Sequence, residues 1–433
     1  MADGMAPGRT ERDATGRHAA ERDVAGRRAA GREATGRATA EGPIRPVAAF
    51  QRIGEENAFR VLARADALRR DGRDIINLGI GQPDFPTPEH VCEAAIRAIR
   101  DGAHGYTPAP GTLECREAVS RRIRTTTGVE VSPDAVLIVP GGKITMHAAI
   151  QMLGEPGADI LYPDPGFPIY RSMIEFTGAR PVPVPMESAD GLSPTAEGIL
   201  SRLTPATRLV IVNSPGNPTG GVMPRAEVDA LAAGLAERPD VAILSDEIYR
   251  AMTYDGVEAA SLLLYPELRD RLIVLDGWSK TWAMTGWRLG WGVWPPALVD
   301  AARKLAVNAW SCVNAPAQAA AIAAIDGPQD AAAAMMEAFA RRRRLIVDGL
   351  DALPGIACSE PMGAFYAFPD VAALGVPARE LANRWLEEAG VATVGGPDFG
   401  TLGEGRVRFS FAASEAEIER ALERLGAWLS RNG

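Results

Sequence analysis

One lysine, Lys280, lies in the apolar segment DGWSKTWAMTGWRLGW (residues 276–291), among tryptophan, glycine and methionine residues. Most lysines lie on solvated surfaces, so an amine in such company is unusual for a fold and common in covalent chemistry. An arginine, Arg288, follows eight positions later. The segment therefore suggests a reactive amine next to a cation that can bind an anion.

Four polar segments each follow a short apolar run that is typical of a buried strand. The run AVLIV precedes PGGK (140–143), RLVIV precedes NSPGNPTG (213–220), VAIL precedes SDEIY (245–249), and RLIVL precedes the lysine segment. Ligands of parallel α/β sheets bind at the carboxyl ends of the strands. We therefore expect these four segments to meet at one rim of a sheet.

The groups on this rim match the chemistry of pyridoxal phosphate. An amine such as that of Lys280 can form a Schiff base with its aldehyde, and a carboxylate such as that of Asp246 can keep its pyridine nitrogen protonated. Glycine amides at a helix N-terminus, together with Arg288, can hold its phosphate. Asn217 and Tyr249 can bond its ring hydroxyl.

Six motifs occur in the same order as in a known family. They are NLGIGQPDFPTP, YTPAPGTLECREAV, PGGK, NSPGNPTGG, SDEIY and SKTWAMTGWRLGW. In these motifs the chain resembles the class I/II aminotransferases, the large fold-type-I family that uses pyridoxal phosphate, and within them the bacterial aspartate-aminotransferase-like subgroup. The matches run from about residue 77 to Arg408, which is nearly everything beyond the N-terminal segment.

The resemblance implies a role for each matching residue. Lys280 would form the Schiff base and, once displaced by the substrate, would move the Cα proton. Asp246 would pair with the pyridinium nitrogen, and Tyr249 would bond the ring hydroxyl, which makes these three the catalytic candidates. The implied cofactor-binding residues are Gly142, Lys143, Phe167, Asn217, Asp246, Tyr249, Ser279, Lys280, Arg288 and Tyr106.

The resemblance also implies a substrate site and a partner. Arg408 would clamp the α-carboxylate of the substrate, helped by Asn217 and the backbone at Gly81. Tyr106 would reach the phosphate in the neighbouring subunit, which implies a homodimer with shared sites. Lys143 is open between the phosphate neighbourhood, a distal carboxylate of the substrate, and solvent.

The elements that must position these residues alternate between strands and helices. Apolar runs separated by segments such as AEVDALAAGLAER predict an α/β domain with a mainly parallel sheet over residues 90–325. Residues 44–89 and 326–433 are expected to form a smaller α+β domain from both ends of the chain. Residues 1–43 contain no aromatic residue and almost no large apolar one, so we expect a disordered extension. The run Arg341–Arg344 is expected on a solvated helix face.

Composition excludes several classes of function. A net charge of −9 disfavours nucleic acid or an anionic membrane as the main partner. Four scattered cysteines and four histidines give no metal-binding spacing, so no metal is expected. No apolar run reaches the roughly 18 residues of a membrane span. We expect a cytoplasmic enzyme with reduced thiols.

The expected activity is amino transfer from an L-amino acid to a 2-oxo acid by a ping-pong mechanism. An alternative is another fold-type-I reaction from the same carbanion, such as C–S lyase chemistry, because the cofactor set alone does not select the reaction. A non-enzymatic regulator would need an N-terminal DNA-binding module, and residues 1–43 lack the apolar pattern for one. The amino donor and acceptor are not readable from the sequence.

Overall fold

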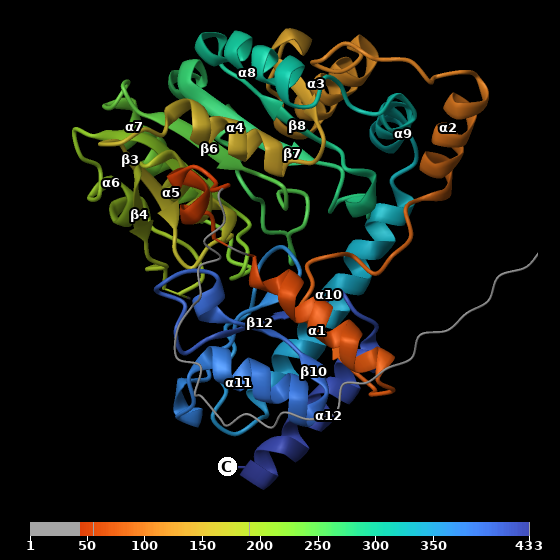
Figure 1. The fold of residues 1–433 in the computed structure, drawn as a ribbon, viewed down its shortest axis with the longest axis vertical. Coiled ribbons are helices and arrows are strands. Elements are labelled where there is room, and N and C mark those ends of the chain that lie inside the picture. The colour runs from red at the N-terminus through yellow and green to blue at the C-terminus, as the bar shows by residue number, and fades with distance from the viewer. Residues whose placement is uncertain (1–43, 55, 190, 433) are drawn as a thin grey trace, which may run out of the picture. The chain divides into compact units, whose positions relative to one another are not determined.

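The computed structural model describes residues 44–54, 56–189 and 191–432, and from Pro46 onward the chain forms one compact unit (Figure 1). The extension predicted over residues 1–43 lies outside the described residues. Within the unit, a large sheet and a group of short strands each have their own helices and their own hydrophobic core.

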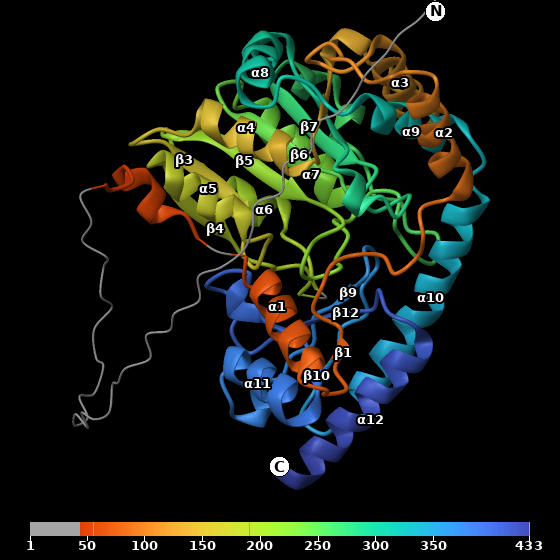
Figure 2. The ribbon, with the colours of Figure 1, turned by 45° about the vertical axis from the view of Figure 1, so that its right-hand side comes forward.

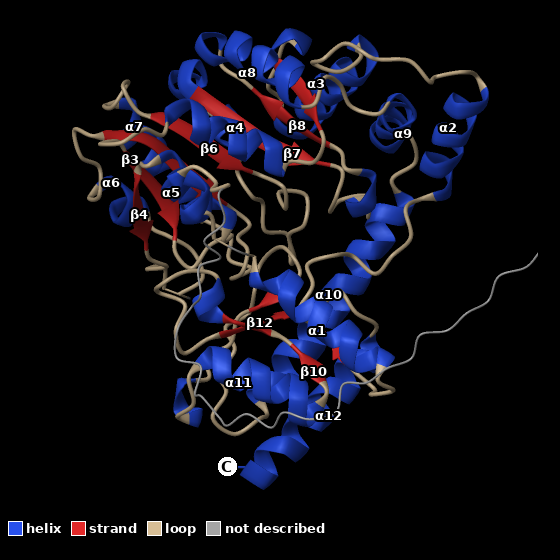
Figure 3. Ribbon diagram, viewed as in Figure 1, coloured by secondary structure: helices blue, strands red, loops and turns tan. Residues whose placement is uncertain are grey.

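A seven-stranded sheet forms the larger part, in the order β2-β8-β7-β6-β5-β3-β4 (Figure 3). Pairs from β4 through β7 are parallel, whereas β8 runs antiparallel to both of its neighbours. The strands are β2 (Val136–Val139), β3 (Asp159–Pro163), β4 (Arg180–Val184), β5 (Thr207–Asn213), β6 (Ala242–Asp246), β7 (Leu272–Gly277) and β8 (Gly290–Val293).

Helices cover both faces of this sheet because successive strand residues are apolar on both sides. In β5, Leu209 and Ile211 join one core while Val210 and Val212 join the other. The first core also contains residues of α4 (Lys143–Leu153), α5 (Ile169–Thr177) and α8 (Pro296–Ala309). The second contains residues of α2 (Glu89–Arg100), α3 (Leu113–Thr127), α6 (Ala196–Leu200), α7 (Arg225–Ala236) and α9 (Ala315–Asp326). This pattern is typical of a sheet buried between two helical layers.

The C-terminal part is built on short strands. The strand β1 (Ile76–Asn77) pairs in parallel with β10 (Val391–Ala392), and an antiparallel sheet has the order β11-β12-β9. Figure 2 shows α1 beside β10, with α10 and α12 packed together along one side. The remaining elements are α1 (Asn57–Arg70), β9 (Tyr366–Ala367), β11 (Val394–Gly395), β12 (Val407–Ser410), α10 (Asp330–Asp351), α11 (Ala378–Arg384) and α12 (Glu415–Asn432).

Ile76 and Leu78 therefore share one core with the C-terminal segment, although the domain boundaries given above stay predictions. The segment before α1 packs on the other part of the molecule: the short helix Ala48–Arg52 contacts α5 of the large sheet layer. Its Phe50 ring meets Phe176 edge to face, with centroids 5.4 Å apart. The chain thus passes from the sheet layer to the C-terminal part just before α1.

The arginine run of α10 contradicts the sequence expectation at its two middle positions, whereas Arg341 and Arg344 are exposed as expected. Arg342 and Arg343 are 7% and 1% exposed and are not part of a solvated face. Arg342 binds both carboxylate oxygens of Asp84 at 2.6 and 3.0 Å, and its guanidinium lies 4.7 Å from the Phe85 ring centroid. Arg343 pairs with Asp255 and, at 3.1 Å, with Glu360. Paired carboxylates and a nearby aromatic ring offset the burial of each guanidinium, although the Nε of both arginines has no hydrogen-bond partner among the described residues.

The predicted fold class is confirmed: the protein is α/β, with a mainly parallel seven-stranded sheet and a small antiparallel sheet. Among the described residues, no helix is both long enough and apolar enough to span a bilayer.

Candidate active site

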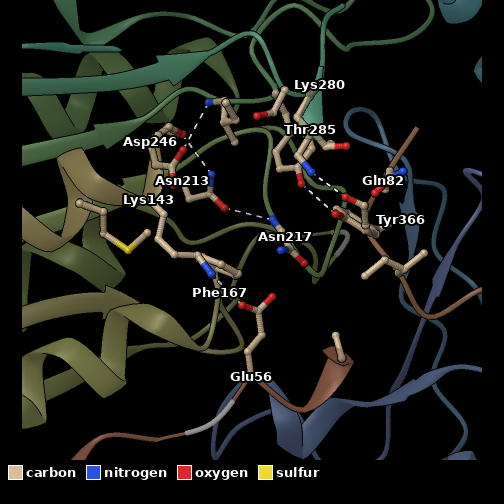
Figure 4. Close-up of a pocket in the computed structure, with 18 of the residues that line it drawn as sticks. Glu56, Gln82, Lys143, Phe167, Asn213, Asn217, Asp246, Lys280, Thr285 and Tyr366 are labelled. Carbon is tan, nitrogen blue, oxygen red and sulfur yellow. Dashed lines mark hydrogen bonds and ion pairs between the residues drawn. The ribbon is translucent and has the colours of Figure 1, made fainter. Parts of the chain in front are cut away.

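A cavity of about 490 Å³ lies at the carboxyl ends of β5, β6 and β7, and it contains almost all of the predicted site residues (Figure 4). The predicted residues that line it are Gly81, Gly142, Lys143, Phe167, Asn217, Asp246, Tyr249, Ser279, Lys280, Arg288 and Arg408. They come from both the sheet layer and the C-terminal part, so the cavity is formed only when the two pack together.

Lys280 lies in the turn that follows β7, and its side chain enters the cavity. Its Nζ donates a hydrogen bond to the Gly81 carbonyl at 2.6 Å and lies 5.7 and 5.6 Å from the ring centroids of Tyr249 and Phe365. Burial lowers the pKa of Lys280 to about 8, assisted by the positive charge of Arg408. Compared with an ordinary lysine, the neutral and nucleophilic amine is then about 300-fold more abundant at neutral pH.

Asp246 ends β6 and is 5% exposed. Tyr170 donates a hydrogen bond to one carboxylate oxygen at 2.7 Å, and the Ile248 amide donates to the other at 3.3 Å. Desolvation nevertheless raises the pKa of Asp246 to about 6. A buried carboxylate of this kind is stabilised in its charged form by a cation placed against it, such as a protonated ring nitrogen.

Arg408 lies on β12 and is 3% exposed. It donates to the Asn217 side-chain oxygen at 2.8 Å and to the Gly79 carbonyl at 2.6 Å, and its guanidinium lies 4.6 Å from the ring centroids of both Tyr366 and Phe399. Its Nε is buried and has no hydrogen-bond partner among the described residues. A buried guanidinium that keeps its charge and has an N–H donor without a partner can bind a carboxylate.

A narrow cradle lies at the N-terminus of α4. Gly141 has φ +93°, and a Cβ added there would lie 2.3 Å from the Arg288 side chain. A Cβ on Gly290 would lie 2.2 Å from the Gly142 amide nitrogen. Only glycine therefore lets the first turn of α4 and the guanidinium of Arg288 come this close. The arrangement combines backbone amides, a helix dipole and an arginine, which together bind phosphate.

Four cavity or supporting residues were not found from the sequence. Tyr366 bonds the Tyr249 hydroxyl at 2.8 Å, and Tyr170 bonds Asp246 as described. Asn213 donates to the Asp246 carbonyl at 3.0 Å, and Glu56 pairs with Lys143 at 2.9 Å. Asn213 had a usable signal, because it ends an apolar run. The other three depend on contacts between distant segments.

Tyr106 is the one predicted residue placed elsewhere. It is 94% exposed and is not among the described residues that line the cavity. Its expected action on a neighbouring subunit stays a prediction.

Comparison with known proteins agrees with this geometry. Residues 73–425 match the family model "Aminotransferase class I and II". The chain is 35% identical to an aspartate aminotransferase of Rhizobium meliloti over 90% of this chain and 98% of that protein. It is 37% identical to the aspartate/prephenate aminotransferase of Thermus thermophilus, with 86% and 95% covered.

Solved structures show the same relationship. The crystal structure of the aspartate aminotransferase from Rhizobium meliloti superimposes with a TM-score of 0.85, 35% identity, and coverage of 90% of this chain and 100% of that chain. The structure of aspartate aminotransferase from Thermus thermophilus with maleate gives a TM-score of 0.83 at 35% identity, with 89% and 100% covered. The chain therefore belongs to the class I and II aminotransferases.

Proposed function

We propose that this aminotransferase uses pyridoxal 5′-phosphate bound at Lys280 to move the amino group of an L-amino acid to a 2-oxo acid. One observation carries the proposal: a desolvated lysine, a buried carboxylate and a buried arginine fork share one cavity.

The residues fit this cofactor on three structural grounds. The cradle at Gly141, Gly142 and Arg288 accepts a phosphate and excludes side chains. Asp246, whose charged form is costly alone, is matched by a pyridinium cation. Phe167 lines the same cavity and supplies an aromatic face. Bound there, the cofactor would supply an electron sink for the bonds at the substrate Cα.

The chain's own groups would then act on the substrate. Arg408 would hold the α-carboxylate, and Asn217, already bonded to Arg408, would fix the angle of the fork. Lys280 would take the Cα proton as a general base, a role suited to an amine with a pKa of about 8. The Tyr249–Tyr366 hydroxyl pair would hold a hydrogen-bond donor against the cofactor ring.

A direct test combines an assay with chemical trapping. The purified holoenzyme is incubated with amino acids and 2-oxo acids, and both products are quantified. We expect stoichiometric exchange that depends on the 2-oxo acid. Release of ammonia and pyruvate without an acceptor would instead indicate lyase chemistry. The chain has only three lysines, Lys143, Lys280 and Lys304, so borohydride reduction and peptide mapping give an unambiguous site, expected at Lys280.

We also propose a homodimer in which Tyr106 completes the neighbouring site. Exposed apolar side chains lie near it in the sequence, on α2 and at the start of α3, namely Ile96, Ile99 and Leu113. A groove lined by residues of α2 shares Gln82, Thr285, Gly286 and Arg288 with the active-site cavity. The expected solution mass is twice the 45.9 kDa of one chain. A second copy that covered these three side chains would remove their apolar surface from water.

Replacing Tyr106 by phenylalanine is expected to weaken cofactor binding about tenfold, the cost of one lost hydrogen bond to a charged group. Titration of the apoenzyme with the cofactor measures this. Mixed dimers of Tyr106→Phe and Lys280→Ala subunits would contain one intact site and regain activity at limiting cofactor. The control Tyr265→Phe removes a phenol that bonds Asp229 elsewhere. Equal affinities of wild type and Tyr106→Phe would refute the shared site.

A further inference from the structure

We infer that Glu56 neutralises Lys143 in the substrate half of the cavity, and thereby selects amino acids with uncharged, largely apolar side chains over acidic ones. This inference rests on the proposed function and adds a substrate class to it. It concerns an acidic residue that lies ahead of the first recognisable motif.

The charged groups of the cavity can be divided by what they face. The described cationic residues that line it are Lys143, Lys280, Arg288 and Arg408, and the described acidic ones are Glu56 and Asp246. Arg288 lies at the phosphate cradle, Asp246 and Lys280 at the cofactor ring, and Arg408 at the α-carboxylate site. Glu56 and Lys143 are left, so they face the part of the substrate that is neither its amine nor its α-carboxylate.

Glu56 and Lys143 form an ion pair that lies next to two aromatic rings. Lys143 donates to Glu56 at 2.9 Å, and its ammonium also lies 5.9 Å from the Phe59 ring centroid and 5.1 Å from that of Phe167. The Glu56 side chain is 19% exposed and that of Lys143 41%. Figure 4 shows Glu56 extending from the segment before α1 toward Lys143 and Phe167.

Glu56 and Lys143 neutralise each other's charge. A carboxylate on the substrate side chain would find Lys143 already paired and Glu56 next to it, so it would meet a like charge in a partly desolvated site. A basic side chain would meet Lys143. An uncharged apolar side chain meets neither penalty, and it can bury surface against the rings of Phe59 and Phe167.

The same preference applies to both substrates. In a ping-pong reaction the 2-oxo acid occupies the cavity after the amino acid has left, and its side chain meets the same ion pair. Monocarboxylic 2-oxo acids such as pyruvate or phenylpyruvate are then better acceptors than 2-oxoglutarate or oxaloacetate. This sets the chain apart from the relatives whose names specify aspartate.

The variant Glu56→Gln frees Lys143 without changing side-chain size. The ratio of kcat/KM for aspartate and glutamate to kcat/KM for phenylalanine and leucine is expected to rise at least about tenfold. Asp66→Asn is the matched control, because it removes one carboxylate from the adjoining helix α1, where Asp66 pairs with Arg69 outside the cavity. Its ratio is expected to stay within threefold of wild type. An unchanged ratio in Glu56→Gln would overturn the inference.

A binding readout separates this inference from the proposed activity. The dissociation constants of succinate and of 3-phenylpropanoate for the holoenzyme are measured by calorimetry. Wild type is expected to bind 3-phenylpropanoate more tightly, and Glu56→Gln is expected to gain at least tenfold for succinate. That gain is expected to disappear in the Glu56→Gln/Lys143→Met double variant.

The outcomes of the two proposals differ. Wild type that transaminates aspartate as well as phenylalanine, and binds succinate as tightly as 3-phenylpropanoate, would refute the role of Glu56 while leaving amino transfer intact. A protein that transaminates no amino acid would refute the proposed function itself. A gain for succinate that persists in the double variant would show that Lys143 does not bind the second carboxylate.

Discussion

Lys280→Ala is expected to lose amino transfer by at least about 10⁴-fold in kcat, since no other described cavity group can supply both the covalent link and the base. The only other cavity lysine, Lys143, pairs with Glu56. Stopped-flow or steady-state assays with saturating cofactor measure the loss. The visible band of the cofactor–lysine adduct is expected to be absent, and borohydride is expected to leave no adduct on the chain.

The matched control is Lys304→Ala, which removes a lysine of α8 that does not line the cavity. This variant is expected to keep wild-type activity and colour. Thermal unfolding of both variants checks that the fold is intact. Lys280→Ala protein that turned over within a hundredfold of wild type would show that a different group carries the reaction.

Asp246→Asn is expected to lower kcat/KM by roughly a thousandfold, because breaking a buried charge pair costs about 3–5 kcal/mol. The asparagine can still accept the hydrogen bond that Tyr170 donates at 2.7 Å, so the change isolates the charge. Kinetics with a good donor measure the loss. The absorbance of the bound cofactor gives an independent readout, because it reports whether the ring nitrogen keeps its proton.

A graded comparison sharpens this result. Tyr170→Phe keeps the Asp246 charge and removes one hydrogen bond, so its loss is expected to be only about tenfold. If Asp246→Asn lost no more than Tyr170→Phe, the charge of the carboxylate would not be the property that matters. The proposed pairing with a pyridinium would then be wrong.

The polar groups at the ends of strands could be predicted because each one directly follows an apolar run in the sequence. Asp246 and Lys280 follow buried apolar runs, and parallel strands bring such ends to one edge. The family membership was predicted from the same motifs and is confirmed. The cofactor, the role of each residue, the dimer and the cytoplasmic location stay predictions.

The residues that escaped prediction depend on contacts between distant segments. Tyr366 meets Tyr249 across 117 positions, and Glu56 meets Lys143 across 87. No local periodicity or turn motif in the sequence indicates such a long-range contact. The burial of Arg342 and Arg343 was unpredictable for the same reason. A run of arginines is ordinarily solvated, and only carboxylate partners on other segments offset the desolvation of these two.

The contacts of these two arginines have a consequence for how the protein unfolds. Arg342 ties α10 to Asp84, five positions after the Gly79 carbonyl that receives Arg408, and Arg343 ties it to Asp255, six positions after Tyr249. Melting of α10 would release both attachments at once. Amide hydrogen exchange along α10 and around residues 79–84 should therefore share a single opening free energy, which makes the substrate end of the cavity part of one cooperative unit with the C-terminal core.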